Sequence, residues 1–402
     1  MATRILRDQV GRNGWKHPTF PAFEESEHRE RFRRAQVALR EGGFTGCICI
    51  APENLFYLGG YDSLSYFNQQ ALVFSVDETI DPTLVIRNVD LSLALETSWI
   101  QDIRTYRLFA ASVPEIIAGV VREQGMLKGR IGIDLQSYAL PGAYALGLMK
   151  ALAPLQVEDV TDLLGRLQFI KSEREMAYLR EAADYAKKGL EAARKTIRPG
   201  ITEIQLAAAI EGAMRAAGSD YWAVPTEIAS GPRTAGGHAA PLPRTLEQGD
   251  LVHFEFAGVA RRYHVPVIHT MAIGDPGPRA REIYDVTIES LRAGVKACKA
   301  GTPVSEVDHA SLEPLRRAGL EHTAMMRFGI GIGIGYPPVW VGSLQIDRYS
   351  KQVLKVGMVF YLHAAIELVD ERIGTIHGAT YALTSSGLET LAGTGDIELE
   401  IA

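Results

Sequence analysis

The pattern of apolar residues changes once along the chain, near residue 168, and this change limits the folds available to it. Before that point, short apolar runs such as 45–50 and 71–75 alternate with helical segments such as 113–124. Strands that alternate with helices are typical of an α/β unit. After that point a long charged helix begins, with apolar residues at helical spacing. We therefore predict two domains, 1–167 and 168–402. The length of 402 residues also favours two domains, because single cores stop growing beyond about 250–300 residues.

The second domain is predicted to be an α+β domain, in which helices pack on one face of a mainly antiparallel sheet. Its expected helices, after the long one, are 202–217, 280–300 and 304–318. Its expected strands are 251–256, 263–273, 358–367 and 375–383.

Composition excludes several partners and locations. The net charge is -6 and no basic run appears, which argues against nucleic acid. No apolar stretch reaches the roughly 18–20 residues that span a bilayer, and the N-terminus lacks the apolar segment of a secretion signal. The three cysteines, Cys47, Cys49 and Cys298, cannot form an even set of disulfides and are expected to stay reduced. We expect a cytoplasmic protein that binds neither nucleic acid nor membranes.

Histidines gather in the predicted strands of the second domain. In the strand 251–256, His253 and Glu255 lie on one face, while Val252, Phe254 and Phe256 lie on the other. Facing a cavity is the economical explanation for the polar face, because burying several imidazoles without a use is costly. The histidines in or beside these strands are His238, His253, His264, His269, His363 and His377.

Two glycine-rich segments are predicted to bring backbone close to a ligand or to another strand. In 328–338, four glycines alternate with isoleucine, but no βαβ unit follows, so a dinucleotide loop is not favoured. In 230–238, glycines set a tight path that ends on His238.

At these residues the sequence resembles the creatinase/methionine aminopeptidase superfamily (peptidase M24), which has the "pita-bread" fold with a curved sheet. The resemblance covers nearly the whole chain. It is carried by Glu255-Phe-Ala-Gly, Arg262-Tyr-His-Val-Pro and Gly331-Ile-Gly-Ile-Gly-Tyr-Pro-Pro-Val-Trp in combination. It is strongest toward the metal-free branch of ectoine hydrolase and creatinase.

The resemblance implies that the dinuclear metal site of the peptidases is lost. Their two Asp, one His and two Glu fall here at Glu255, Pro266, Ile330, His363 and near Gly378. Proline and isoleucine cannot bind a metal, and a dinuclear site needs bridging carboxylates. We expect no metal and no cofactor, and keep a mononuclear site of His363, His264 and Glu255 as an alternative.

The resemblance instead implies a metal-independent hydrolase of a non-peptide C–N bond in a small amidine, guanidino or amide metabolite. His238 matches the histidine that the metal-free enzymes use as a general acid and base. Glu255 is expected to hold a cation or orient water. Further substrate contacts are expected from His253, Tyr263, His264, His269, Tyr336, Tyr361, His363 and His377.

The metal-free relatives are dimers in which an N-terminal loop reaches the partner's active site. The matching loop here, 59–70, would make the protein a homodimer and place Tyr61 and Phe67 at that site.

Departures from the relatives leave the substrate open. Creatinase has a glutamate where Ile268 stands here, and both relatives have a glutamate on the last strand, where this chain has 376–379. His269 replaces an arginine that is common in the family. Fewer carboxylates predict a substrate that is less cationic than creatine or ectoine, or that has its own carboxylate. A lyase and a non-catalytic binding module on the same fold remain alternative functions. A metallopeptidase is a further, less favoured alternative.

Overall fold

The computed structural model describes residues 2–10, 15–394 and 398–402. Contacts divide the chain into two compact units, Met1–Leu167 and Gln168–Ala402. Among the described residues, no helix combines the length and the apolar character needed to cross a membrane.

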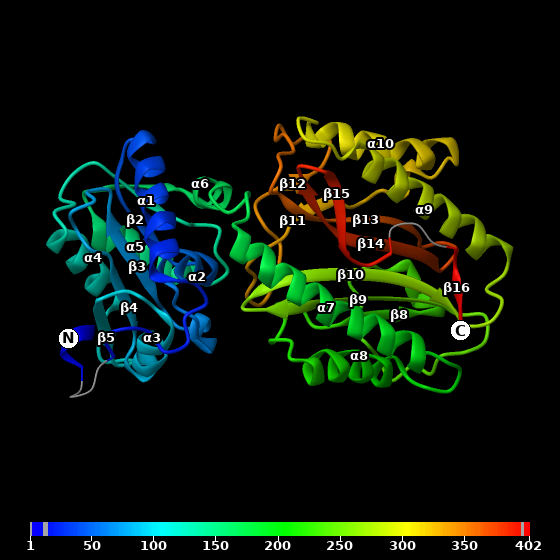
Figure 1. Ribbon diagram of the computed structural model, residues 1–402, viewed down its shortest axis with the longest axis horizontal. Helices are drawn as coiled ribbons and strands as arrows, with labels where there is room; N and C mark the ends of the chain where they lie inside the picture. Colours follow the sequence, from blue (N-terminus) through cyan, green and yellow to red (C-terminus); the bar gives the residue numbers. More distant parts are fainter. Residues whose placement is uncertain (1, 11–14, 395–397) are drawn as a thin grey trace. The chain divides into compact units, whose positions relative to one another are not determined.

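The first unit is built around a mixed sheet, shown in blue and cyan in Figure 1. Its strand order is β1-β5-β4-β3-β2-β6-β7, with parallel pairs at β4/β5, β2/β6 and β6/β7. The strands are β1 (Thr3–Leu6), β2 (Phe44–Cys49), β3 (Ala71–Ser75), β4 (Thr83–Arg87), β5 (Asp102–Tyr106), β6 (Arg130–Ile133) and β7 (Gln156–Asp159).

Helices α4 and α5 cover one face of this sheet with an apolar layer that includes Ile117, Val121 and Leu148. This unit therefore has the predicted α/β character. Its helices are α1 (Glu25–Glu41), α2 (Pro52–Gly59), α3 (Leu91–Thr97), α4 (Val113–Glu123), α5 (Gly142–Leu152) and α6 (Thr161–Arg166), with short 3-10 turns η1 (Arg7–Gln9), η2 (Leu64–Phe67) and η3 (Asn88–Asp90).

The second unit contains a larger sheet whose strand order is β12-β11-β13-β14-β10-β9-β8, with β15 added to β14 and β16 to β10. Every pair in this sheet is antiparallel except β10/β16, which confirms the predicted mainly antiparallel sheet. The strands are β8 (Glu227–Ser230), β9 (Leu251–Ala260), β10 (Tyr263–Ala272), β11 (Gly329–Gly331), β12 (Gln345–Ile346), β13 (Val359–Leu368), β14 (Ile373–Thr384), β15 (Gly387–Ala392) and β16 (Glu400–Ile401).

Four helices cover one face of this sheet and leave the other face for polar side chains. Figure 1 shows α7 beside β9 and β10, and α9 over β13 and β14. Gly258 of β9 packs so closely on α7 that an added Cβ would lie 2.0 Å from the Ala182 carbonyl oxygen. The helices are α7 (Glu173–Thr196), α8 (Glu203–Ala217), α9 (Pro278–Ala297) and α10 (Val304–Arg317), with 3-10 turns η4 (Gly231–Ala235) and η5 (Glu321–Thr323).

The glycine run places backbone against backbone, as predicted. Gly329 lies in β11 against β13, where an added Cβ would come within 2.5 Å of the Tyr361 carbonyl oxygen. Gly342 returns over Gly331, where an added Cβ would lie 2.7 Å from the Gly331 carbonyl oxygen. Side chains at these positions would separate the strands.

Candidate functional site

A row of five residues crosses the second sheet on the face away from the helices. In register, Glu227 pairs with Glu255, Glu255 with Ile268, Ile268 with Gly378, and Gly378 with His363. Directly paired residues of antiparallel strands project from the same face of a sheet. Glu227, Glu255 and His363 therefore share one polar surface.

Glu227 and Glu255 form a pair of carboxyl groups on neighbouring strands. Burial raises the pKa of Glu255 to about 8, with the Glu227 charge as the second cause, while the nearby Tyr361 hydroxyl opposes the rise. Burial also raises the pKa of Glu227, and the positive charge of His238 lowers it. Two adjacent, half-buried carboxyls resist full ionisation, so the pair holds a proton near neutral pH.

Strand β13 adds three polar groups to the same face, because Tyr361, His363 and Glu367 are separated by even numbers of residues. Burial lowers the pKa of His363 to about 4, and the charges of Arg327 and His238 act in the same direction. Burial raises the pKa of Glu367, against the effect of His238. His363 is therefore neutral near pH 7.

His238 lies in the loop after η4 and is exposed to solvent. It acts electrostatically on Glu227, His363 and Glu367, which places it among groups from both β8 and β13. The neighbouring Gly237 is close enough to Glu367 that an added Cβ would lie 2.7 Å from its Oε1. An accessible imidazole thus faces several carboxyl groups.

Glu203, at the start of α8, anchors this loop from beneath. It is fully buried and forms an ion pair with Arg233. It accepts hydrogen bonds from the Ser230 hydroxyl at 2.6 Å and from the Leu242 amide at 2.8 Å. Arg233 also donates to the Ala240 carbonyl at 2.9 Å. The anchor holds both ends of the segment that carries His238.

Two other predicted histidines share the face of Glu255. His253 lies beside the backbone of Thr234 and Gly236, and burial lowers its pKa to about 4. His264 accepts from the Ala223 amide through Nε2 at 2.9 Å and donates through Nδ1 to the Arg262 carbonyl at 2.8 Å. Both nitrogens of His264 are occupied by backbone, which suits a structural role.

Tyr263, His269 and His377 lie on the opposite, helix-covered face, which corrects the expectation that they line the cavity with Glu255. His269 pairs with Phe254, and its ring centroid is 4.7 Å from that of His377. Tyr263 donates to Glu175 of α7 at 2.9 Å. The cause is parity: each residue is an odd number of positions from a residue of the cavity face.

The His269–His377 pair is held by groups from α7 and the C-terminal strand. His269 Nε2 is 3.4 Å from Glu400 Oε1, and Arg194 of α7 binds the same carboxylate through two nitrogens. His377 Nε2 donates to the Thr394 carbonyl at 2.5 Å. These histidines connect the sheet with helix α7 and the C-terminal strand, and they do not lie on the face of Glu255.

The remaining predicted contacts lie elsewhere. Tyr336 is buried beside Arg262, whose guanidinium carbon is 4.9 Å from its ring centroid. Tyr61 is buried in the first unit, whereas Phe67 of η2 is 76% exposed.

Three charged residues near the site were missed from the sequence: Glu227, Glu367 and Arg327. Glu367 could have been found, because it lies four residues after His363 on the same strand and so shares its face. Glu227 depends on the pairing of β8 with β9, which no local pattern reveals. With Glu227 and Glu367 the site has more carboxyl groups than the sequence predicted, while the charge of the substrate stays a prediction.

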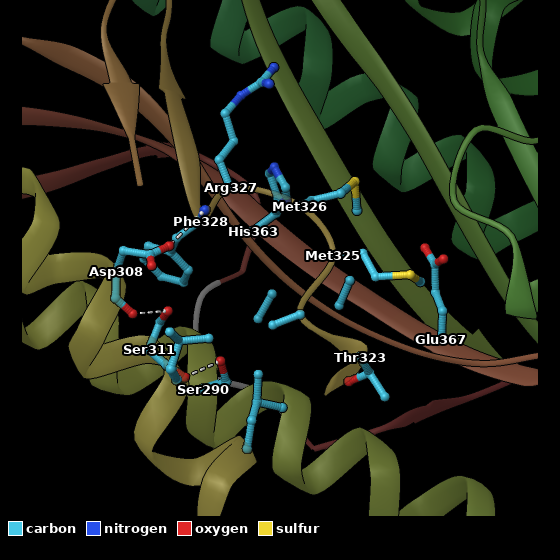
Figure 2. A pocket seen from close by; sticks show the side chains of 15 residues that line it. Ser290, Asp308, Ser311, Thr323, Met325, Met326, Arg327, Phe328, His363 and Glu367 are labelled. Carbon is cyan, nitrogen blue, oxygen red and sulfur yellow. Dashed lines mark hydrogen bonds between the residues drawn. The ribbon is translucent and has the colours of Figure 1, made fainter. Parts of the chain in front are cut away.

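A cavity opens beside His363 and Glu367, beneath the segment that leads from η5 to β11. Figure 2 shows it at the edge of β13, near helices α9 and α10, with lining residues from both faces of the strand. The cavity is small, because the space it leaves for the centre of a water-sized molecule is about 30 Å³. The lining residues are Ser290, Asp308, Ser311, Leu312, Leu315, Thr323, Ala324, Met325, Met326, Arg327, Phe328, His363, Ala364, Ala365 and Glu367.

The donor set does not fit a dinuclear metal centre. In the row across the sheet, Ile268 and Gly378 have no ligating side chains, and they separate Glu255 from His363. The described part of the chain contains no group of three or more His, Cys, Asp or Glu arranged to hold a metal ion. The mononuclear alternative lacks His264, whose nitrogens are bonded to backbone.

Comparison with models of known protein families shows the family to which this chain belongs. Residues 177–386 match "Metallopeptidase family M24", and residues 31–170 match "Creatinase/Prolidase N-terminal domain". This chain belongs to the metallopeptidase family M24. It is a hydrolase of that family with the creatinase-type N-terminal domain and the pita-bread fold.

Relatives within family M24 differ in what they are named for. An uncharacterized hydrolase/peptidase, y4tM, of Sinorhizobium fredii is 26% identical over 92% of this chain and 97% of its own length. The ectoine hydrolase of Halomonas elongata is 24% identical over 92% and 96%. A prolidase structure from Thermococcus sibiricus has a TM-score of 0.84 at 22% identity, covering 93% of this chain and 99% of its own. This last likeness shows the fold alone.

Proposed function

We propose that this protein hydrolyses a non-peptide C–N bond in a small cationic metabolite of the amidine, guanidino or amide type, without a metal ion. The observation that carries the proposal is the gathering of Glu227 and Glu367 around the accessible imidazole of His238, with Glu255 paired beside Glu227. Carboxylates of this kind bind a delocalised cation through charge-assisted hydrogen bonds. The cation makes its central carbon electrophilic, so no Lewis acid is needed to polarise it.

His238 serves as the general acid and base. It takes a proton from a water molecule, whose oxygen bonds to the central carbon of the bound cation. The same imidazolium then returns the proton to the nitrogen that departs as the C–N bond breaks. Proton transfer by a positioned side chain of this kind contributes roughly 10²–10⁴-fold to the rate.

Glu255 and Glu227 hold the cation and respond to it. In the empty site their pair retains a proton near neutral pH, because burial raises both pKa values and the Glu227 charge raises that of Glu255 further. A bound cation reverses this balance and favours two ionised carboxylates. Substrate binding is therefore coupled to proton release.

Turnover of a defined panel tests the proposal. The panel contains ectoine, creatine, cyclic amidines, guanidino acids and an Ala-Pro dipeptide, followed by proton NMR after dialysis against a chelator. We expect turnover of an amidine-type member by the wild type and by His17→Ala, which removes an exposed histidine of the first unit, and none by His238→Ala. Turnover that survives in His238→Ala contradicts the assigned role. Hydrolysis of Ala-Pro only after metal addition would favour a metal-dependent peptidase, as the name of the prolidase relative indicates for that protein.

We also infer that the protein acts as a homodimer in the cytoplasm. The 3-10 turn η2 presents Phe67 and Leu64 with 76% and 60% of their surfaces exposed, as a loop that inserts into a partner would. The three cysteines are free and buried, which suits a reducing compartment. Light scattering with activity measurements tests the dimer: Phe67→Ala should lose turnover or dimerisation, and a fully active monomer would disprove the inference.

A further inference from the structure

Tyr361 of β13 is a buried side chain whose hydroxyl the proposed mechanism does not use. Only 2% of its surface is exposed, and the hydroxyl has no hydrogen-bond partner of standard geometry among the described residues. A buried hydroxyl without a partner is unfavourable, because its bonds to water are lost and not replaced. The explanation has to come from the groups that this hydroxyl faces.

The register of the sheet directs Tyr361 toward Glu255. Tyr361 lies two residues before His363 and shares its face, and the two ring centroids are 5.3 Å apart. His363 and Glu255 belong to the same row across the sheet, in which β14 and β10 contribute Gly378 and Ile268. Gly378 has no side chain that would separate Tyr361 from the carboxyl group.

The Tyr361 hydroxyl acts on Glu255 as a hydrogen-bond donor does. It lowers the pKa of Glu255, against burial and the charge of Glu227 on β8, which together raise this pKa to about 8. Burial raises the pKa of Tyr361 well above its ordinary value, and the charge of Glu255 adds to the rise. The phenol therefore keeps its proton and can donate it to an ionised carboxylate.

We propose that Tyr361 is a positioning residue that donates a hydrogen bond to Glu255 whenever this carboxyl group is ionised. The bond holds one oxygen of the carboxylate and leaves the other oxygen for a substrate cation. Charge-assisted bonds of this kind are roughly twice as strong as bonds between neutral groups. The use of the fixed carboxylate for a cation rests on the proposed function, whereas the bond itself does not.

Infrared titration of the protonated Glu255 carboxyl band tests the bond on the full-length protein without any substrate. The first variant is Tyr361→Phe, which removes only the hydroxyl. The matched control is Tyr381→Phe, because Tyr381 has an equally buried hydroxyl without a partner of standard geometry among the described residues. Tyr381 pairs with Phe360 and so lies on the helix-covered face. The second variant has 3-fluorotyrosine at position 361, which keeps the hydroxyl and makes it a stronger donor.

We expect the pKa of Glu255 to rise by at least about one pH unit in Tyr361→Phe, because a hydrogen bond to a charged group is lost. It should fall below the wild-type value with 3-fluorotyrosine and stay unchanged in Tyr381→Phe. An unchanged or lowered pKa in Tyr361→Phe overturns the inference, as does an equal rise in Tyr381→Phe. If Tyr361→Phe does not fold, the 3-fluorotyrosine protein decides, and a pKa that does not fall overturns the inference.

Turnover of the substrate panel separates this inference from the proposed function. The ascending limb of kcat/KM against pH reports ionisation of the free enzyme, so it should move up by about one pH unit in Tyr361→Phe and keep its place in Tyr381→Phe. An infrared shift without turnover of any panel member leaves the bond standing and refutes the hydrolase. Turnover without an infrared shift refutes the bond and leaves the hydrolase standing.

Discussion

Replacing Glu227 by glutamine should lower the pKa of its neighbour Glu255, which burial and the Glu227 charge raise to about 8. The two residues are direct partners in the β8/β9 register. Such partners have Cβ atoms about 4.5–5.5 Å apart. Two unit charges roughly 6 Å apart repel by about 2.8 kcal/mol at an effective dielectric constant of about 20, which corresponds to about two pH units.

The expected fall for Glu227→Gln is therefore about one to two pH units. Burial is the larger cause and remains, so the pKa of Glu255 should stay above its ordinary value of 4.5. Infrared titration of the protonated carboxyl band, with Glu255→Gln to assign the band, measures the change without any substrate. Glu191→Gln, at an exposed site on α7, is the control and should leave the band unchanged. A band that titrates unchanged in Glu227→Gln would refute the pairing of the two carboxyls.

Three further predictions concern stability. Glu203→Ala leaves Arg233 without its buried partner and should lower the free energy of unfolding in urea by about 3 kcal/mol. Glu191→Ala at the surface should lower it by less than about 0.5 kcal/mol. Equal losses would contradict the role of Glu203 in holding the His238 loop. Gly378→Ala places a Cβ 2.5 Å from the Leu362 carbonyl oxygen and should destabilise the protein by about 1–3 kcal/mol. Gly119→Ala, in helix α4 with open space around it, should stabilise the protein by about 0.5–1 kcal/mol. Stability changes of the same sign in both variants would refute the close packing at Gly378. Burial, then the charge of His269, lowers the pKa of His377 to about 3, so its stabilising contribution is complete above its ordinary pKa of 6.5 and is lost as the pH falls toward 3. Between pH 6.5 and 5 the wild type should lose about 2 kcal/mol more than His377→Leu, and parallel pH profiles of the two proteins would disprove this.

The sequence predicted the two-domain architecture, the mainly antiparallel sheet and the polar face of β9. These features follow from local patterns: helical spacing, alternation along a strand and the change of pattern near residue 168. The alternation of His253 and Glu255 against Phe254 is a property of one strand and needs no partner.

Predicting the other site residues required knowing which face of its strand each residue occupies, or which distant segments pair. The predicted site contained Tyr263, His264 and His269, but these residues lie on both faces of β10, because side chains alternate along a strand. Applying the same alternation to β13 would have added Glu367 to His363. Glu227 was beyond reach, because β8 is a strand of four residues whose register with β9 is set by the fold.

The buried ion pair beneath the His238 loop has a consequence for the entropy of catalysis. Glu203 and Arg233 fix the segment between Ser230 and Leu242 before any substrate arrives. Ordering a free segment costs about 1–2 kcal/mol of conformational entropy for each residue whose backbone becomes fixed. A disordered loop would add this cost to the activation free energy of each turnover. In the proposed hydrolysis the activation entropy then contains no cost for ordering this loop. The rate should then follow a single straight Eyring plot up to the temperature at which the anchor itself melts.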